Sequence, residues 1–148
     1  MSKKISIAID AMGGDNSPDK TIQGIKIFLD KNRTKNDFII NLFGKEKIIL
    51  DKLKDYKISS DTINVINSET VISDEETPLT AVKSSRGTSM WDCIKHQLDG
   101  KSDISLSAGN TGVLLVISRM ILKMMNEVSK PALAGLWPSQ EGMNVVLV

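Results

Sequence analysis

The segment ISIAIDAMGGDNSP, residues 5–18, holds the pattern that decides the fold. Its first part, residues 5–10, alternates larger and smaller residues as a β-strand in a sheet does. Two glycines then turn the chain, and Ser17 followed by Pro18 predicts the N-cap and the first turn of a helix. A strand, a glycine turn and a helix in this order are typical of the βαβ units that build parallel sheets.

The same alternation of short β-branched runs and longer helical patterns continues along the chain. It predicts a single α/β domain with a mostly parallel sheet over residues 1–148. Strands are predicted over residues 5–10, 38–43, 62–67, 102–107, 131–136 and 144–148. Helices are predicted over residues 17–30, 45–56, 79–100 with a break at Gly87, and 113–127. Apolar spacing predicts the inward faces of the first three helices: Ile22, Ile25, Phe28, Leu29, Ile48, Ile49, Leu53, Met90, Trp91, Ile94 and Leu98.

Composition is that of an ordinary globular protein and argues against nucleic-acid binding. Hydrophobic residues make up 41% and charged residues 25% of the 148 residues, and the formal net charge is +1, so no strong basic field attracts a polyanion. Aromatic residues reach only 4%, which is too few for platforms on which bases stack. A single cysteine, Cys93, and a single histidine, His96, exclude an internal disulfide and a zinc cluster of the usual type. We therefore expect no metal site and a reducing, cytoplasmic location.

The loop after the first predicted strand is the first candidate binding site. Asp10, Gly13, Gly14 and Asp15 stand there, between the end of a strand and the start of a helix. Backbone N–H groups and the positive end of a helix dipole converge at such a turn, so it can bind an anion without a basic side chain. The spacing matches neither G-x-G-x-x-G nor a Walker loop, so it supports neither dinucleotide nor nucleoside triphosphate binding. A tight turn without a ligand is the alternative interpretation.

The loop after the strand predicted at 102–107 repeats this arrangement. Asn110, Thr111 and Gly112 lie there, directly before the next predicted helix. Parallel strands have their carboxyl ends at one edge of the sheet, where open α/β sheets bind ligands, so both loops are expected at that edge. Simple helix capping by Asn110 and Thr111 is the alternative.

Lys83 and Arg86 are the basic candidates for the same anion, since they stand among serines and threonines that suit phosphate. Solvated surface charge is the alternative for both. His96 is expected to point to solvent and Cys93 to pack in the interior. The sequence shows no nucleophile elbow, catalytic triad or metal-binding run, so no catalytic residue is assigned.

Three motifs, in this order, resemble those of one family. They are IAIDAMGGD at residues 7–15, SAGNTG at 107–112 and KPALA at 130–134. Over nearly its whole length, the chain resembles the bacterial phosphate acyltransferases of phospholipid synthesis, the PlsX family.

The resemblance implies an acyltransferase that moves a fatty acyl group from acyl carrier protein to inorganic phosphate, giving acyl phosphate for phospholipid synthesis. It implies no cofactor, and a three-layer α/β/α sandwich like that of the isocitrate and isopropylmalate dehydrogenases. It also implies a cytoplasmic homodimer that works near the membrane beside a glycerol-phosphate acyltransferase. Inorganic phosphate is already a nucleophile near neutral pH, so such an enzyme needs positioning and charge stabilisation rather than a covalent intermediate or a metal.

Two positions depart from the family pattern. Asn16 stands where the family commonly has histidine, which argues against a catalytic role for that position. Lys83 and Arg86 stand where the family carries a longer basic run, which leaves a weaker anion site or carrier-protein contact open. The apolar run at 145–148 has no cap or turn after it. We therefore expect the N-terminal part of a longer protein, inactive by itself; a short natural protein ending on a buried strand is the alternative.

Two other functions stay open from the sequence. A non-catalytic module could bind a phosphorylated metabolite with the same loops. A nicotinamide-dependent dehydrogenase of the isopropylmalate type would share the fold, although its acidic metal ligands have no clear counterpart in this chain.

Overall fold

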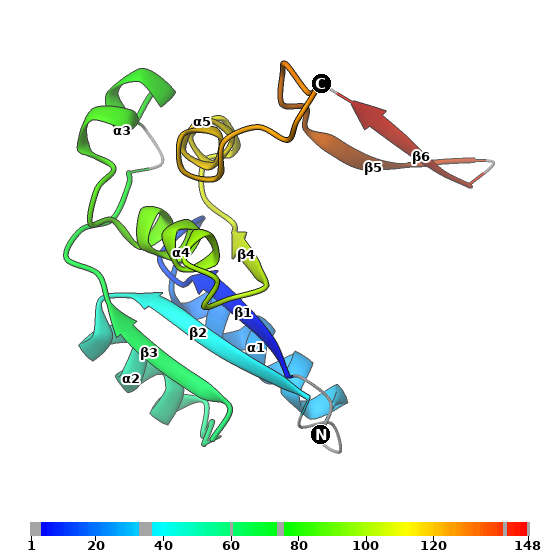
Figure 1. Cartoon of the computed structure of the whole chain (residues 1–148). Helices are drawn as coiled ribbons and strands as arrows, with labels where there is room; N and C mark the ends of the chain where they lie inside the picture. Colours follow the sequence, from blue (N-terminus) through cyan, green and yellow to red (C-terminus); the bar gives the residue numbers. More distant parts are fainter. Residues whose placement is uncertain (1–3, 33–36, 60, 74–75, 141, 148) are drawn as a thin grey trace.

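The computed structural model describes residues 4–32, 37–59, 61–73, 76–140 and 142–147. The elements in these ranges alternate between strands and helices for most of the chain (Figure 1). In order they are β1 (Ile5–Asp10), α1 (Asp19–Lys31), β2 (Phe38–Gly44), α2 (Glu46–Asp55), β3 (Ile63–Asn67), α3 (Pro78–Ser84), α4 (Ser89–Leu98), β4 (Ile104–Ser107), α5 (Thr111–Leu122), β5 (Ala134–Ser139) and β6 (Gly142–Leu147).

Four strands form one parallel sheet in the order β3-β2-β1-β4. β1 is central, and its Asp10 pairs with Phe43 of β2 on one side and with Ser107 of β4 on the other. The predicted α/β class with a mostly parallel sheet is therefore confirmed. Because all four strands run the same way, their carboxyl ends meet at one edge of the sheet.

Helices α1 and α2 cover one face of this sheet (Figure 1). Their buried side chains meet those of β2, a strand rich in apolar residues as expected for one covered on both faces. The cluster comprises Ala11, Ile22, Ile25, Phe38, Ile40, Leu42, Ile49 and Leu53. It holds α1 in place, directly after the first candidate loop.

Helix α4 covers the other face, where Cys93 packs with Ala8 and Phe43. Helix α5 in turn packs on α4 and α3 through a second buried cluster. That cluster comprises Ala81, Met90, Ile94, Val113, Ile117 and Ile121. Helices on both faces of a parallel sheet are the arrangement that βαβ units produce.

Several helix predictions were wrong in detail. Ile48 and Leu98 were expected to point inward, but their side chains are 41% and 48% exposed. Ile48 adjoins Ile49, and consecutive helical residues differ in direction by about 100°, so only one of the two faces the core. Helix α5 ends at Leu122 instead of continuing to residue 127, since Lys123 has a φ of 63°, which does not continue a right-handed helix.

A layer of polar side chains crosses the sheet. Asn64 donates to the side-chain oxygen of Asn41 at 2.9 Å, and Asn41 donates to the hydroxyls of Ser6 at 3.0 Å and Ser102 at 3.3 Å. Ser102 also lies 2.8 Å from Nδ1 of His96, whose ring packs edge-on against Phe43. The expectation that His96 points to solvent was wrong: its side chain is half-buried and joined to this layer. Burial lowers its pKa, and the positive charge of Lys101 adds to the effect.

The last two strands form a separate antiparallel ribbon instead of joining the parallel sheet. Residues 134–139 pair with residues 142–147, so the predicted strands at 131–136 and 144–148 are shifted by a few residues. The ribbon extends away from the rest of the chain, and its described residues are exposed on both faces (Figure 1). A run of apolar residues is compatible with either pairing, because the pattern alone does not identify the partner strand.

Candidate functional site

The two candidate loops lie side by side at the carboxyl edge of the sheet. Asp10, the last residue of β1, pairs with Ser107, the last residue of β4. The first loop follows Asp10 and leads into α1, and the second follows Ser107 and leads into α5. The expectation that both loops share one edge is confirmed.

The first loop requires glycine at Gly13 and Gly14, because the second loop lies very close to its backbone. A Cβ atom on Gly13 would lie 2.8 Å from the backbone nitrogen of Gly109 and 2.6 Å from Oδ2 of Asp10. Gly14 has a φ of +87°, and a Cβ atom on it would lie 2.6 Å from the carbonyl oxygen of Ala108. These positions therefore make a tight turn and also let two backbones pack against each other.

Asp10 is buried, with 2% of its surface exposed, and it organises both loops. Its carboxylate accepts hydrogen bonds from the hydroxyl of Ser107 at 2.8 Å and from the backbone N–H of Met12 at 3.2 Å. Burial raises the pKa of Asp10, while hydrogen bonds from Ser89, Ser107 and the loop backbone oppose that rise. Its oxygens are thus engaged by the protein, which suits a residue that positions the loops.

Ser17 does not cap α1 as predicted, because its hydroxyl is used inside the loop. It lies 2.5 Å from the carbonyl oxygen of Gly13 and 2.7 Å from that of Gly14. The N-cap position of α1 is occupied by Pro18, with no side-chain hydrogen bond. Sequence reasoning missed this role, as it missed that of Ser107. The alternation of serine with apolar residues in β4 was the available signal, since it places Ser107 on the same face as Asp10.

Helix α5 begins at the second loop with a formed cap. The side-chain oxygen of Asn110 accepts a hydrogen bond of 3.1 Å from the backbone N–H of Val113. The capping interpretation is therefore confirmed for Asn110. The N–H groups of Thr111 and Gly112 belong to the first turn, where a helix offers them no carbonyl partner of its own. The positive end of the α5 dipole adds to their attraction for an anion.

Beside this close contact, residues of both loops line a cavity of about 380 Å³. Among the residues that the structure describes, its lining consists of Gly14, Asp15, Ala108, Gly109, Asn110, Thr111 and Gly112. Five predicted site residues, Gly14, Asp15, Asn110, Thr111 and Gly112, are thus brought together around one space. Gly13 and Asp10 are not in this lining, but Gly13 lies against Asp10 and against Gly109, which does line the cavity. Asp15 is exposed at the rim and carries a negative charge that opposes anion binding.

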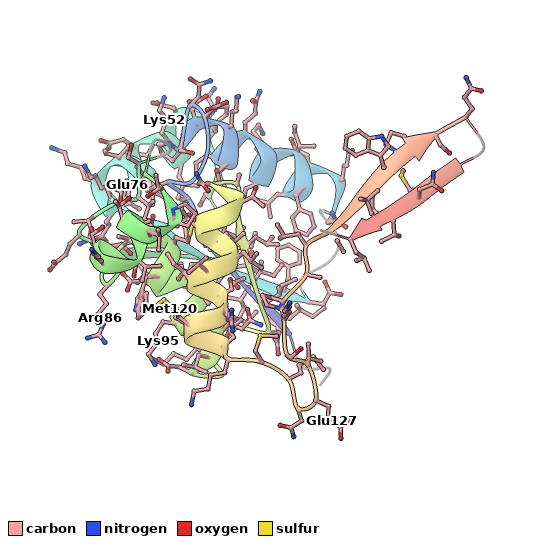
Figure 2. The ribbon with its side chains drawn as sticks, turned by 90° about the horizontal axis from the view of Figure 1, so that it is seen from above. Lys52, Glu76, Arg86, Lys95, Met120 and Glu127 are labelled. Atoms are coloured by element: carbon pink, nitrogen blue, oxygen red, sulfur yellow. The ribbon has the colours of Figure 1, made fainter. Side chains whose placement is uncertain are left out.

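Lys83 and Arg86 are not part of this lining. Lys83 is exposed in the last turn of α3, and the guanidinium of Arg86 lies 5.9 Å from the ring centre of Trp91. Figure 2 shows the side chain of Arg86 directed away from the body of the protein. The structure therefore supplies positive potential at the cavity from backbone N–H groups and a helix end.

The Cys93 thiol is poorly suited to act as a nucleophile. Burial raises the pKa of the Cys93 thiol to about 12, so the thiolate that a nucleophile requires is scarce at neutral pH. The expectation that Cys93 packs in the interior is confirmed.

Within the described ranges, no group of three or more His, Cys, Asp and Glu side chains could hold a metal ion. The same ranges contain no helix long and apolar enough to cross a bilayer.

Comparison with known proteins places the chain in one family. The family model described as "Fatty acid synthesis protein" matches residues 5–148. A phosphate acyltransferase from Pelagibacter ubique is 44% identical over 147 residues, which cover 99% of this chain and 43% of that protein. Phosphate acyltransferases from Azorhizobium caulinodans and Brucella ovis are 34% and 35% identical, and the matches cover 99% and 97% of this chain and 41% of each relative.

The chain belongs to this family of fatty acid synthesis proteins. It spans about 40% of the length of the phosphate acyltransferases to which it is similar. The activity of the whole protein is therefore taken up as a proposal.

Proposed function

We propose that this chain forms the phosphate-binding part of an acyltransferase that moves a fatty acyl group from acyl carrier protein to inorganic phosphate. The observation that carries the proposal is the pair of loops at the ends of β1 and β4, with a cavity of about 380 Å³ between them. The names of the relatives, phosphate acyltransferases, support phosphate as acceptor and acyl as the group transferred. They give no support to a non-catalytic module or a dehydrogenase.

In this proposal the phosphate lies between the two loops. The N–H groups of Thr111 and Gly112 donate to its oxygens, and the start of α5 offsets its charge. Asp10 acts behind them as a positioning residue, because its carboxylate holds Met12 and Ser107 in place. Lys83 and Arg86 are left out of the phosphate site, since neither lines the cavity.

The reaction then needs no protein nucleophile. A phosphate oxygen attacks the carbonyl carbon of the acyl thioester, the new C–O bond forms and the C–S bond breaks. The leaving thiolate takes up a proton and departs as the thiol of the carrier. The loops contribute by holding the phosphate close to the thioester and by stabilising the negative charge that develops on the thioester oxygen.

The remaining properties of the whole protein follow from the resemblance described above. We propose acyl carrier protein as the acyl donor, a homodimer as the assembled form, and a cytoplasmic location with peripheral contact to the membrane beside a glycerol-phosphate acyltransferase. We further propose that the complete protein has a three-layer fold like that of the isocitrate and isopropylmalate dehydrogenases. On this proposal residues 1–148 alone produce no acyl phosphate.

The decisive experiment compares Thr111→Pro with Thr111→Ala in the complete gene product. Proline at this first helical position removes the backbone N–H but suits the helix start, and Asn110 already has a ψ of 118°, which a following proline favours. Alanine removes only the hydroxyl. With acyl carrier protein thioester and phosphate as substrates, Thr111→Pro should raise the KM for phosphate at least about tenfold, as expected for a lost charge-assisted hydrogen bond.

Thr111→Ala separates the backbone from the side chain. If the N–H group is the donor, this variant keeps a KM for phosphate near that of the unchanged protein. An unaltered KM for phosphate in Thr111→Pro would contradict the proposed site. Absence of acyl phosphate formation by the unchanged complete protein would contradict the proposed function itself.

A further inference from the structure

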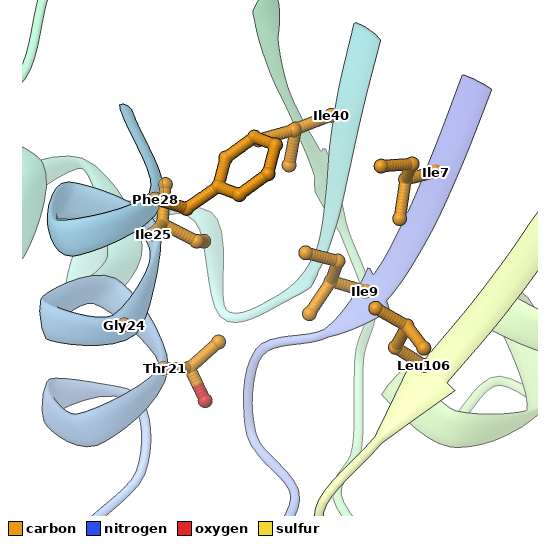
Figure 3. Close-up of a pocket in the computed structure, with 8 residues that line it drawn as sticks. All are labelled: Ile7, Ile9, Thr21, Gly24, Ile25, Phe28, Ile40 and Leu106. Atoms are coloured by element: carbon orange, nitrogen blue, oxygen red, sulfur yellow. The ribbon is translucent and has the colours of Figure 1, made fainter. Parts of the chain in front are cut away.

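A second cavity lies on the face of the sheet that α1 covers. It is a groove of about 290 Å³ between α1 and strands β1, β2 and β4. Its lining comprises Ile7, Ile9, Thr21, Gly24, Ile25, Phe28, Ile40 and Leu106, of which only Thr21 has a polar side chain (Figure 3). Apolar grooves of this size suit the hydrocarbon part of a small ligand.

The groove has a defined direction relative to the candidate site. Strands β1 and β4 run toward the loops and α1 runs away from them, so Ile9, Leu106 and Thr21 lie at the loop end. Ile7 and Phe28 lie at the far end. Thr21 and Phe28 are seven residues apart on α1, which corresponds to about 10 Å along the helix.

The loop end of the groove adjoins the residues that carry the loops. Ile9 pairs with Leu106, and the next pair along the same two strands is Asp10 with Ser107. Side chains alternate between the two faces, so the apolar pair faces the groove while the polar pair faces α4. The groove is therefore lined by residues that directly precede Asp10 and Ser107, and the phosphate cavity is lined by residues of the loops that follow them.

Gly24 keeps the groove open. It lies in the middle of α1, where glycine is less favourable than alanine, and a Cβ atom placed on it would meet no atom within 4 Å from the other described parts of the chain. Two apolar side chains bordering the groove, Phe28 and Leu106, remain 39% and 47% exposed. An apolar ligand in the groove would cover this surface.

We propose that the groove holds the hydrocarbon tail of the acyl substrate, with the thioester at the loop end and the tail running toward Phe28. The proposal rests on the proposed acyl transfer to phosphate, and it adds where chain length is recognised. Each methylene group that the groove covers should improve binding about fourfold. Preference for long acyl chains would then reside in α1 and the strands facing it.

The test is Gly24→Leu in the complete gene product, assayed with palmitoyl and butyryl thioesters of acyl carrier protein. Leucine fills the open space beside α1 without meeting another atom near its Cβ position. The KM for the palmitoyl donor should rise about tenfold or more, whereas the KM for the butyryl donor and the KM for phosphate should stay unchanged. Gly24→Ala should give a smaller shift in the same direction.

Gln23→Leu is the matched control, because Gln23 is exposed on the same helix and does not line the groove. It should leave all three KM values unchanged. If Gly24→Leu is active and its KM for the palmitoyl donor equals that of the unchanged protein, the proposed acyl groove is wrong and the proposed phosphate site is unaffected. An unchanged protein that forms no acyl phosphate would overturn both proposals.

Photocrosslinking provides a readout that does not depend on the variant folding. A palmitoyl analogue carrying a diazirine in its tail, incubated with the unchanged complete protein, should label peptides that contain residues 21–28 or Leu106. If the label falls only on peptides outside these two segments, the tail does not lie in the groove and the proposal is wrong.

Discussion

The hydroxyl of Ser107 donates a hydrogen bond of 2.8 Å to the carboxylate of Asp10, and it also accepts one of 3.1 Å from the backbone N–H of Gly109. This one side chain links the ends of β1 and β4 to the second loop. Because Asp10 also accepts from Met12, the relative position of the two loops depends on a few short-range contacts at the edge of the sheet.

Ser107→Ala should therefore loosen both loops. It removes a hydrogen-bond donor from the buried Asp10 and an acceptor from Gly109, so we expect a loss of about 1–3 kcal/mol in the free energy of unfolding. In the complete protein the KM for phosphate should rise as well. Ser105→Ala is the control, since Ser105 lies on the same face of β4 but bonds to Gln97. A larger rise in this KM from Ser105→Ala than from Ser107→Ala would contradict the assigned role.

Two glycine-to-alanine substitutions should have opposite effects on stability. Gly14→Ala places a Cβ atom 2.6 Å from the oxygen of Ala108 at a φ of +87°, so it should destabilise the fold by at least about 1–2 kcal/mol. Gly24→Ala meets no neighbour and improves helix propensity, so it should stabilise the fold by about 0.5–1 kcal/mol. Chemical denaturation monitored by circular dichroism measures both. Equal effects of the two substitutions would refute the close approach of the loops.

His96 should make stability depend on pH in the mildly acidic range. Burial lowers its pKa in the folded chain below the ordinary value of about 6.5, so between these two values the unfolded chain binds more protons. Its contribution to stability is thus fully present above about pH 6.5 and is lost as the pH falls toward the lowered pKa. Urea denaturation from pH 7.5 to 5 should show this slope, and His96→Gln should reduce it. A slope that is unchanged in His96→Gln would assign the effect to other groups.

Cys93 should be unreactive in the folded chain. Burial raises its pKa to about 12, and its Sγ lies 3.7 Å from the carbonyl oxygen of Leu106. A chromogenic disulfide reagent at pH 8 should therefore release almost no colour until denaturant is added, after which one thiol should react. Fast labelling of the native chain would show that α4 separates readily from the sheet and exposes Cys93.

The parts of the site that the sequence predicted are those set by strand direction. Residues 5–10 and 102–107 were recognised as strands, and parallel pairing alone places the loops that follow them at one edge. The glycine turn and the cap at Asn110 are local features, so they were also accessible from the sequence. The class of fold followed from the same alternation of elements.

Other parts depend on contacts between distant residues. Ser17 has the sequence signature of a cap, but its hydroxyl turns back to the loop. His96 lies on the polar side of its helix by periodicity, yet it meets Ser102 because the following turn returns to the sheet. Lys83 and Arg86 are suitable for phosphate by residue type, and only the packing of α3 and α4 places them outside the cavity.

The polar layer through Asn64, Asn41 and Ser102 has a consequence for assembly. Sliding β4 along β1 by one residue would turn Ser102 and its neighbours to the apolar face, and the buried amide of Asn41 would lose one of its two acceptors and keep only Ser6. A sheet with β4 in this shifted register is therefore less stable, and the chain disfavours it while folding. The favoured register is the one that pairs Asp10 with Ser107. The amides and hydroxyls of the polar layer, although remote from the cavity, therefore help to fix the relative position of the two loops that line it.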